Sequence, residues 1–259
     1  MKLTIHDVGH GGCISLVHSN GNAMLWDVGH QGDNRPSSIL PNSGINSVEY
    51  LFITNYDEDH VSDMPEFRSK VGIRAVYRNK SISPTALRAL KLKGGPISPA
   101  MDSTLDLLSG LSEGLMSPLP SFQGISHSVY CNNYGTEYDD TNNISLVTFV
   151  SIGGSKFIIP GDLERKGWLG LLQNRAFVEE LRGVNVFVAS HHGRESGYCK
   201  EVFDICSPNV FVFSDSQKQH ATQETTQLYA KHAKGIQFNG ATRYVLTTRN
   251  DGTFSWNFG

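Results

Sequence analysis

The segment TNYDEDH, residues 54–60, decides how this sequence is interpreted. It follows directly on the largely apolar run VEYLFI, residues 48–53, which is typical of a strand buried on both faces. Three acidic side chains and one histidine occupy residues 57–60. Like charges this close repel, and burying any of them is costly unless a positive charge lies among them. Because cations would convert that repulsion into coordination, the segment indicates a metal site at a strand end.

Acidic and imidazole side chains also follow the ends of other apolar runs. They are Asp27 after AMLW, Asp162 after KFIIPG, and His191 and His192 after VNVFVAS. Taken singly, each has a structural interpretation, such as a strand-ending turn at Asp27 or a helix N-cap at Asp162. Together they indicate more, because active sites collect at strand ends in layered α/β folds, and carboxylates with imidazoles are metal ligands. We therefore expect one site built from several strand ends.

The composition indicates a soluble globular protein. The chain has 259 residues, of which 39% are hydrophobic and 18% charged. No apolar run approaches the roughly 20 residues that cross a bilayer, and the N-terminus leads straight into strand-like sequence instead of a signal peptide. The four cysteines are widely spaced and form no CxxC pair, as is typical of reduced thiols. These features predict a cytoplasmic protein without a membrane segment, and they leave protein partners and the oligomeric state open.

Strand-like and helix-like segments alternate along the chain without a long linker. A meander of short strands with glycine-containing turns opens the chain, and residues 242–256 are expected to close it as a hairpin. Helical segments fill much of the range 81–124, which we interpret as a cap or insert. This order predicts an α/β fold of two mixed sheets covered by helices, in one domain spanning residues 1–259.

Charge is distributed unevenly within a formal net charge of −3. Between Phe67 and Met101 there is no acidic residue. The basic residues of this run are Arg68, Lys70, Arg74, Arg78, Lys80, Arg88, Lys91 and Lys93. The plain interpretation is a solvated surface of helices and loops. The alternative is a basic patch that attracts a phosphate-bearing substrate, and the sequence leaves both open.

The order of these motifs resembles the metallo-β-lactamase fold, whose signature HxHxDH is followed by a distant ligand, a bridging Asp and a late His. It is similar to the hydrolase domain at the C-terminal end of bacterial competence proteins that form DNA-uptake channels, where the second His of the signature is Asp. The landmarks of that branch stand here as DVGHGG (7–12), WDVG (26–29), NYDEDH (55–60), NNISLV (142–147), GD (161–162) and HHG (191–193). One departure is Gly12, where the branch has Asp. The resemblance spans essentially the whole chain and implies a metallo-β-lactamase-like αββα sandwich of two mixed sheets flanked by helices.

The resemblance also implies two metal sites that share a bridging carboxylate. One site would use Asp59, His60, Asp162 and His191. The other would use Asn55, Asp57, Asp162 and a third group, for which Asn143, Ser145 and His127 remain open. Because an amide oxygen replaces an imidazole at Asn55, this half turns oxygen-rich and suits Mn²⁺ or Mg²⁺ better than Zn²⁺. We expect one or two divalent ions per chain, Zn²⁺ or Mn²⁺, with a single-metal site and a degenerate pocket as the alternatives to a two-metal site.

The chemistry that the resemblance implies is hydrolysis by a metal-bound hydroxide, with Asp59 and Asp162 as catalytic residues. His220 is the candidate proton donor to the leaving group. Candidate substrate contacts are His192, Arg194, Ser196 and Asn143. Asp27 would orient His60 or a metal-bound water from outside the ligand set.

The competence-like motifs favour phosphodiester hydrolysis, and with it a nuclease or nucleotide phosphodiesterase that acts on nucleic acid or a nucleotide. Two other classes remain open, because one fold hosts many chemistries. The first is a hydrolase of small substrates such as lactones or other esters. The second, motivated by Asn55, is a catalytically degenerate module that binds a nucleotide.

Overall fold

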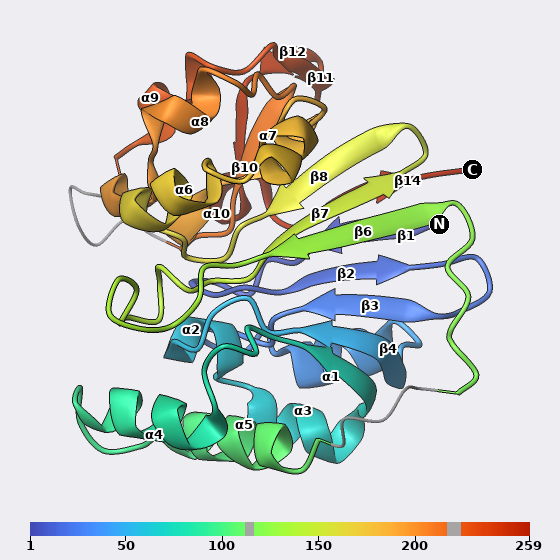
Figure 1. Ribbon diagram of the computed structural model, residues 1–259. Coiled ribbons are helices and arrows are strands. Elements are labelled where there is room, and N and C mark those ends of the chain that lie inside the picture. The colour runs from blue at the N-terminus through green and yellow to red at the C-terminus, as the bar shows by residue number, and fades with distance from the viewer. Residues whose placement is uncertain (112–116, 217–223) are drawn as a thin grey trace.

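The computed structural model describes residues 1–111, 117–216 and 224–259, which form four layers (Figure 1). Two six-stranded mixed sheets lie in the middle, and helices cover the outer face of each. A separate two-stranded sheet pairs β11 (Ile236–Phe238) with β12 (Ala241–Arg243). The two mixed sheets flanked by helices confirm the predicted αββα sandwich. The assignment of residues 1–259 to one domain stays a prediction.

The first sheet has the strand order β14-β1-β2-β3-β4-β5. Its strands are β1 (Lys2–Ile5), β2 (Ile14–Val17), β3 (Ala23–Trp26), β4 (Ser47–Phe52), β5 (Gly72–Tyr77) and β14 (Phe254–Asn257). β3, β4 and β5 run parallel, whereas the remaining pairings are antiparallel. The helices on its side of the molecule are α1 (Pro36–Asn42), α2 (Glu58–Val61), α3 (Met64–Lys70), α4 (Pro84–Leu92) and α5 (Pro99–Ser109).

The second sheet has the strand order β13-β10-β9-β8-β7-β6. Its strands are β6 (Ile125–Tyr130), β7 (Val147–Ile152), β8 (Ser155–Ile159), β9 (Val186–Val188), β10 (Val210–Phe213) and β13 (Val245–Thr247). Its helices are α6 (Arg165–Leu171), α7 (Arg175–Leu181), α8 (Lys200–Phe203) and α9 (Thr226–Ala230), with the 3₁₀ turns η1 (Ser190–Gly193) and η2 (Glu195–Gly197) after β9. Across the described residues, no helix combines the length and hydrophobicity that crossing a bilayer requires.

Neighbouring residues of one strand enter different cores, because successive side chains point to opposite faces of a sheet. In β3, Met24 and Trp26 pack between the two sheets, whereas Ala23 and Leu25 pack beneath the outer helices. β10 repeats the pattern, with its valines between the sheets and its phenylalanines beneath the helices of the second sheet. Burial of both faces explains why these strands appear in the sequence as continuous apolar runs.

The predicted hairpin at residues 242–256 is wrong. β13 joins the second sheet, where it pairs parallel with β10, and β14 joins the first sheet, where it pairs antiparallel with β1. Between them lies α10 (Thr248–Asp251), so the chain crosses here from one sheet to the other. Two short strands separated by a turn have the same local sequence pattern whether they pair with each other or join different sheets. The pairing depends on distant strands, which local sequence does not reveal.

The predicted helical range 81–124 contains α4 and α5, while residues 112–116 lie outside the described part of the chain. A serine caps the N-terminus of each helix. The Ser83 hydroxyl accepts a hydrogen bond from the Ala86 amide, and the Ser98 hydroxyl accepts one from the Met101 amide. Leu87 of α4 is buried against the core of the first sheet's outer face. The interpretation of this range as a cap stays a prediction.

Three loops meet around Gly29, beside the site described below. The Gly12 amide donates to the Asp59 carbonyl oxygen at 2.9 Å, and the Gly29 amide donates to the Gly12 carbonyl oxygen at 2.9 Å. A Cβ atom on Gly29 would lie 1.5 Å from the Asp59 carbonyl oxygen. Only glycine therefore fits at this position without moving the backbone that carries the signature.

We expect Gly29→Ala to destabilise the fold, because the new methyl group would collide with backbone that cannot swing away as a side chain can. Overpacking of this kind costs up to about 3 kcal/mol in the free energy of unfolding. For a chain of this size, that corresponds to a loss of roughly 6–12 °C in Tm, measured by scanning calorimetry. Gly135→Ala is the control, since nothing lies within 4 Å of a Cβ there. Equal Tm values for the two variants would contradict the prediction.

Candidate metal centre

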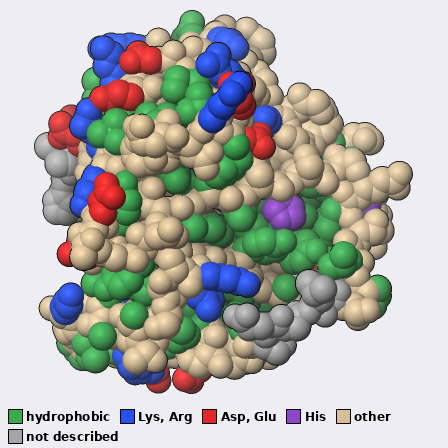
Figure 2. Space-filling model, in the orientation of Figure 1, with side chains coloured by type: hydrophobic (Ala, Val, Ile, Leu, Met, Phe, Trp, Pro, Cys, Tyr) green, Lys and Arg blue, Asp and Glu red, His purple; other side chains and the backbone are tan. Residues whose placement is uncertain are grey.

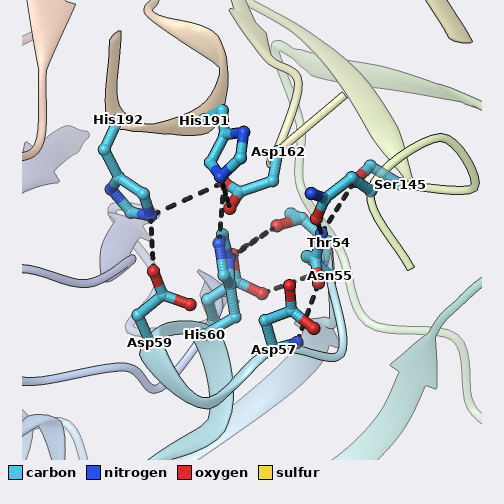
Figure 3. A network of polar contacts seen from close by, with 12 residues as sticks. Thr54, Asn55, Asp57, Asp59, His60, Ser145, Asp162, His191 and His192 are labelled. Carbon is cyan, nitrogen blue, oxygen red and sulfur yellow. Dashed lines mark hydrogen bonds and ion pairs between the residues drawn. The ribbon is translucent and has the colours of Figure 1, made fainter. Parts of the chain in front are cut away.

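Four side chains from separate parts of the chain converge at one point (Figure 3). Asp59 and His60 lie on α2, directly after β4, while Asp162 follows β8 and His192 lies on η1 after β9. One ligand atom from each side chain lies within 4.8 Å of the others. Two imidazole nitrogens with two carboxylate oxygens are a donor set that Zn²⁺ and related divalent ions accept.

Buried polar atoms without partners mark the middle of this cluster. Within the described residues, His60 Nε2, Asp162 Oδ1 and His192 Nε2 are buried and lack a hydrogen-bond partner, although nearly all buried polar atoms in proteins have one. Asp162 Oδ1 lies 2.9 Å from His60 Nε2 and 3.5 Å from His192 Nε2. A cation between the three atoms would satisfy all of them, so these residues fit a divalent ion.

Asp27 holds His60 through the ring nitrogen that does not face the cluster. His60 Nδ1 donates to Asp27 Oδ2 at 2.8 Å, which leaves Nε2 directed at the centre. The Thr54 amide donates to the other carboxylate oxygen of Asp27 at 2.8 Å. Burial by itself would lower the pKa of His60, but the carboxylates of Asp162 and Asp27 outweigh it and hold that pKa well above its usual value. Asp27 thus contacts His60, and its role in orienting that ring or a metal-bound water stays a prediction.

The backbone is strained at three residues of this site. Asp27, His191 and His192 have φ values of 59°, 53° and 52°, in the left-handed region that side chains other than glycine rarely adopt. The one other such residue in the described ranges is Asn239. Strain of this kind costs free energy and concentrates at functional sites, where the surrounding structure enforces it.

Asp59 is held by two imidazoles. Its Oδ2 atom lies 3.3 Å from His192 Nε2 and 3.1 Å from His10 Nε2. Burial would raise the pKa of Asp59, but the imidazoles of His10 and His192 beside its carboxylate reverse the effect and hold that pKa well below its usual value. His10 is a residue that sequence reasoning missed. Its signal was present, because it lies inside the opening motif DVGHGG.

The two adjacent histidines have different partners. His192 Nδ1 donates to the Ser214 carbonyl oxygen at 2.7 Å, which leaves Nε2 for the cluster. His191 Nδ1 lies 3.0 Å from Ser196 Oγ, and its Nε2 lies 3.5 Å from Asp162 Oδ2. The structure therefore brings His192, predicted as a substrate contact, into the four-residue cluster, and leaves His191, predicted as a ligand, beside it.

Asn55, the first residue of the signature, is fully buried and its amide is occupied. Its Oδ1 accepts the Asp57 amide at 2.8 Å, and its Nδ2 donates to Asn142 Oδ1 at 2.9 Å and Ser145 Oγ at 3.2 Å. Asp57 Oδ1 accepts hydrogen bonds from Lys91 Nζ and from Thr141 Oγ1, each at 2.8 Å. Asn55 and Asp57, which were predicted for the second metal site together with Asp162, thus have other partners, and neither belongs to the four-residue cluster.

The groups considered as the third ligand also have other partners. Asn143 Nδ2 donates to Asp140 Oδ2 at 2.9 Å, and its Oδ1 accepts the Gly167 amide at 2.7 Å, so this side chain ties α6 to the preceding loop. His127, on β6, packs among aromatic rings with its centroid 5.3 Å from that of Tyr77.

The remaining predicted contacts lie after the histidine pair. Arg194 directly follows η1, and its Nε atom is buried without a hydrogen-bond partner among the described residues. Ser196 lies on η2 and bonds to His191. His220 falls within residues 217–223, outside the described part of the chain.

Solved structures share the architecture of this chain. Igni18, a metallo hydrolase from the archaeon Ignicoccus hospitalis, is 16% identical and matches over 100% of both chains with a TM-score of 0.54. The metallo-β-lactamase fold protein YhfI from Bacillus subtilis is 8% identical over 99% of this chain and 100% of its own, with a TM-score of 0.53. This chain has the metallo-β-lactamase fold. The fold predicted from the order of the motifs is thereby confirmed.

At the level of sequence, the chain is similar to ComE operon protein 3 of Bacillus subtilis (strain 168), with 22% identity over 228 residues. The match covers 84% of this chain and 27% of that protein, so the chain spans about a quarter of the relative's length. This similarity confirms the resemblance that the motifs predict. No family model matches the sequence.

Proposed function

We propose that this metallo-β-lactamase fold protein is a metal-dependent hydrolase that cleaves phosphodiester bonds in nucleic acid or a nucleotide. The observation that carries the proposal is the convergence of three buried ligand atoms that make no hydrogen bond, from His60, Asp162 and His192, beside the Asp59 carboxylate. Burying these polar and charged side chains without a cation is costly. If packing were their only role, apolar side chains would fill the space better.

Asp59, His60, Asp162 and His192 would hold the ion, Zn²⁺ or Mn²⁺. A divalent ion bound there supplies Lewis acidity that activates water and polarises the substrate. Asp27 fixes the ring of His60 through Nδ1, and the Ser214 carbonyl oxygen fixes that of His192 in the same way. Each imidazole would therefore offer Nε2 to an ion. His10 contacts Asp59 from a partly exposed position, where it can exchange a proton with solvent or with a leaving group.

Phosphodiesters are the substrate class that the similarity to the competence protein supports. Fold alone does not select a substrate. No broad basic patch is seen on the face drawn in Figure 2, where lysine and arginine side chains are scattered and several lie beside acidic ones. The basic run of residues 68–93 contributes to the site in another way. One of its members, Lys91, reaches the signature itself and bonds to Asp57 at 2.8 Å, which supports a negatively charged substrate at this place.

The test combines metal content with cleavage of bis-p-nitrophenyl phosphate. The purified protein, loaded with Mn²⁺ or Zn²⁺, should release p-nitrophenolate, EDTA should abolish the reaction, and added metal should restore it. Metal-loaded protein that leaves the phosphodiester intact would contradict the proposal. Hydrolysis of a lactone in the same assay would then favour a hydrolase of small esters, and nucleotide binding without turnover would favour a degenerate module.

A further inference from the structure

In the half of the signature that begins with Asn55, the side chains predicted as metal ligands are engaged by hydrogen bonds within the protein. The Asn55 side chain uses its oxygen on the Asp57 amide and its nitrogen on Asn142 and Ser145. A ligand must direct a lone pair at the ion, and the oxygen of this amide is directed at the backbone amide of Asp57. The position that carries an imidazole in the family signature therefore ties the loop together.

The Asp57 carboxylate already has a cation. Lys91 Nζ lies 2.8 Å from Asp57 Oδ1, and Thr141 Oγ1 donates to the same oxygen at 2.8 Å. The Lys91 side chain is 24% exposed, so it is not a freely solvated surface lysine. Asp57 also occupies the N-cap position of α2, the helix that carries two members of the metal cluster, although its side chain makes no capping hydrogen bond there. The ammonium is thus held by a residue of the signature, two positions before Asp59 in the chain.

The insert that carries Lys91 is held in place independently of this ion pair. Leu87, one turn earlier on α4, is buried in the core. The Ser98 hydroxyl, at the start of α5, donates to Glu58 Oε2 at 2.7 Å, next to Asp57 in the chain. The lysine therefore projects from a docked element and does not depend on Asp57 alone for its position.

Three arginines of the run have other partners. Arg68 donates to Ser103, Arg78 to the carbonyl oxygens of Asn79 and Ile82, and Arg88 to Asp102. These contacts hold the insert and its neighbouring loops together. Lys91 differs from them, since within the described part of the chain its ammonium makes one hydrogen bond, to Asp57, and an ammonium has three donors.

We propose that Lys91 takes the part of a second metal ion: its ammonium binds an anionic oxygen of the substrate, and each chain uses one divalent ion, at Asp59, His60, Asp162 and His192. The inference rests on the proposed function and specifies how an anionic substrate is held. A lysine ammonium carries one positive charge, which can neutralise a phosphoryl oxygen. Unlike a metal ion, it does not coordinate a water molecule.

The first measurement is the metal count of the wild-type protein by native mass spectrometry after loading with excess Mn²⁺ and desalting. One ion per chain is expected, and two ions per chain would overturn the inference. This measurement needs no variant, so it tests the number of bound ions even if a substitution at Lys91 disturbs folding.

The second measurement is calorimetric titration of the metal-loaded protein with inorganic phosphate. Lys91→Gln keeps a donor for Asp57 but removes the charge, and the phosphate Kd should rise about 10- to 100-fold, the worth of one charge-assisted hydrogen bond. Lys91→Arg should recover most of the loss. Lys93→Gln, an exposed residue of the same insert, is the matched control and should leave Kd unchanged. Equal phosphate affinity in Lys91→Gln and wild type would overturn the inference.

Thr141→Val separates phosphate binding from a merely structural role of Lys91. It removes the other donor to the Asp57 carboxylate without changing charge, so phosphate affinity should stay close to that of the wild type. An equal loss in Thr141→Val and Lys91→Gln would show that Lys91 acts only by ordering Asp57, and would overturn the inference. Failure of the proposed function has a different signature: phosphate binding that depends on Lys91, with one ion bound, but no phosphodiester cleavage.

Discussion

Asp162→Asn should abolish metal binding at the cluster and reduce phosphodiester cleavage at least about a thousandfold. Asp162 is buried, and its Oδ1 atom lies 2.9 Å from His60 Nε2 and 3.5 Å from His192 Nε2. Burial would raise its pKa, but the charges of His60 and His192 lower that pKa to about 2, so the carboxylate is ionised at neutral pH. The amide has nearly the same shape but no charge. Loss of an ion that contributes several kcal/mol to the transition state corresponds to about three orders of magnitude in rate.

Two measurements check this expectation: metal content by mass spectrometry and the initial rate of bis-p-nitrophenyl phosphate cleavage. Asp33→Asn is the matched control, because Asp33 is exposed and carries the same change of charge. It should keep both metal and rate. Wild-type metal content in Asp162→Asn would contradict the assignment of Asp162 as a ligand, and full activity without bound metal would contradict the proposed function as well.

His192→Gln should cost far more metal affinity than His191→Gln. His192 Nδ1 is fixed by the Ser214 carbonyl oxygen, and its Nε2 atom is buried without a hydrogen-bond partner among the described residues, as expected of a ligand. His191 bonds through Nδ1 to Ser196 and lies beside Asp162. We expect a loss of at least about 100-fold in metal affinity for His192→Gln and of about tenfold or less for His191→Gln, in the range of a neighbour that only supports a ligand.

Metal affinity can be measured by competition with a chromophoric chelator, so the comparison does not depend on turnover. The two variants control for each other, since they make the same substitution at adjacent residues with the same strained backbone. The reverse order of losses would return the ligand role to His191, as the sequence predicts. Equal losses would mean that both imidazoles coordinate the ion.

Much of the fold could be predicted from local sequence. Strands such as β3 and β10 appear as apolar runs because both of their faces are buried, and polar residues at their ends appear where the backbone leaves the sheet. The motif order added the family resemblance. The hairpin at 242–256 failed, because β13 and β14 find their partners in different sheets, more than 30 residues away for β13 and about 250 for β14.

The sequence indicated which residues gather at the candidate site better than it indicated their contacts. Asp59, His60 and Asp162 follow from their positions after apolar strands, where the fold must bring them together. The pairing of Lys91 with Asp57 could not be predicted, because it depends on where the α4 insert docks and joins residues 34 positions apart. Nor could Asn55 be identified as a structural tie, since its partners lie in the loop before β7.

What the sequence determined by itself is therefore the layered fold and the set of acidic and imidazole side chains at its strand ends, because both depend on short-range patterns of burial. What only the tertiary structure decided is which member of that set faces the centre. His191 and His192 are neighbours with similar φ values, and their rings are held differently, through contacts with Ser196 and Ser214. A ring nitrogen is aimed by the partner of the other nitrogen, and that partner is fixed by packing across the whole chain.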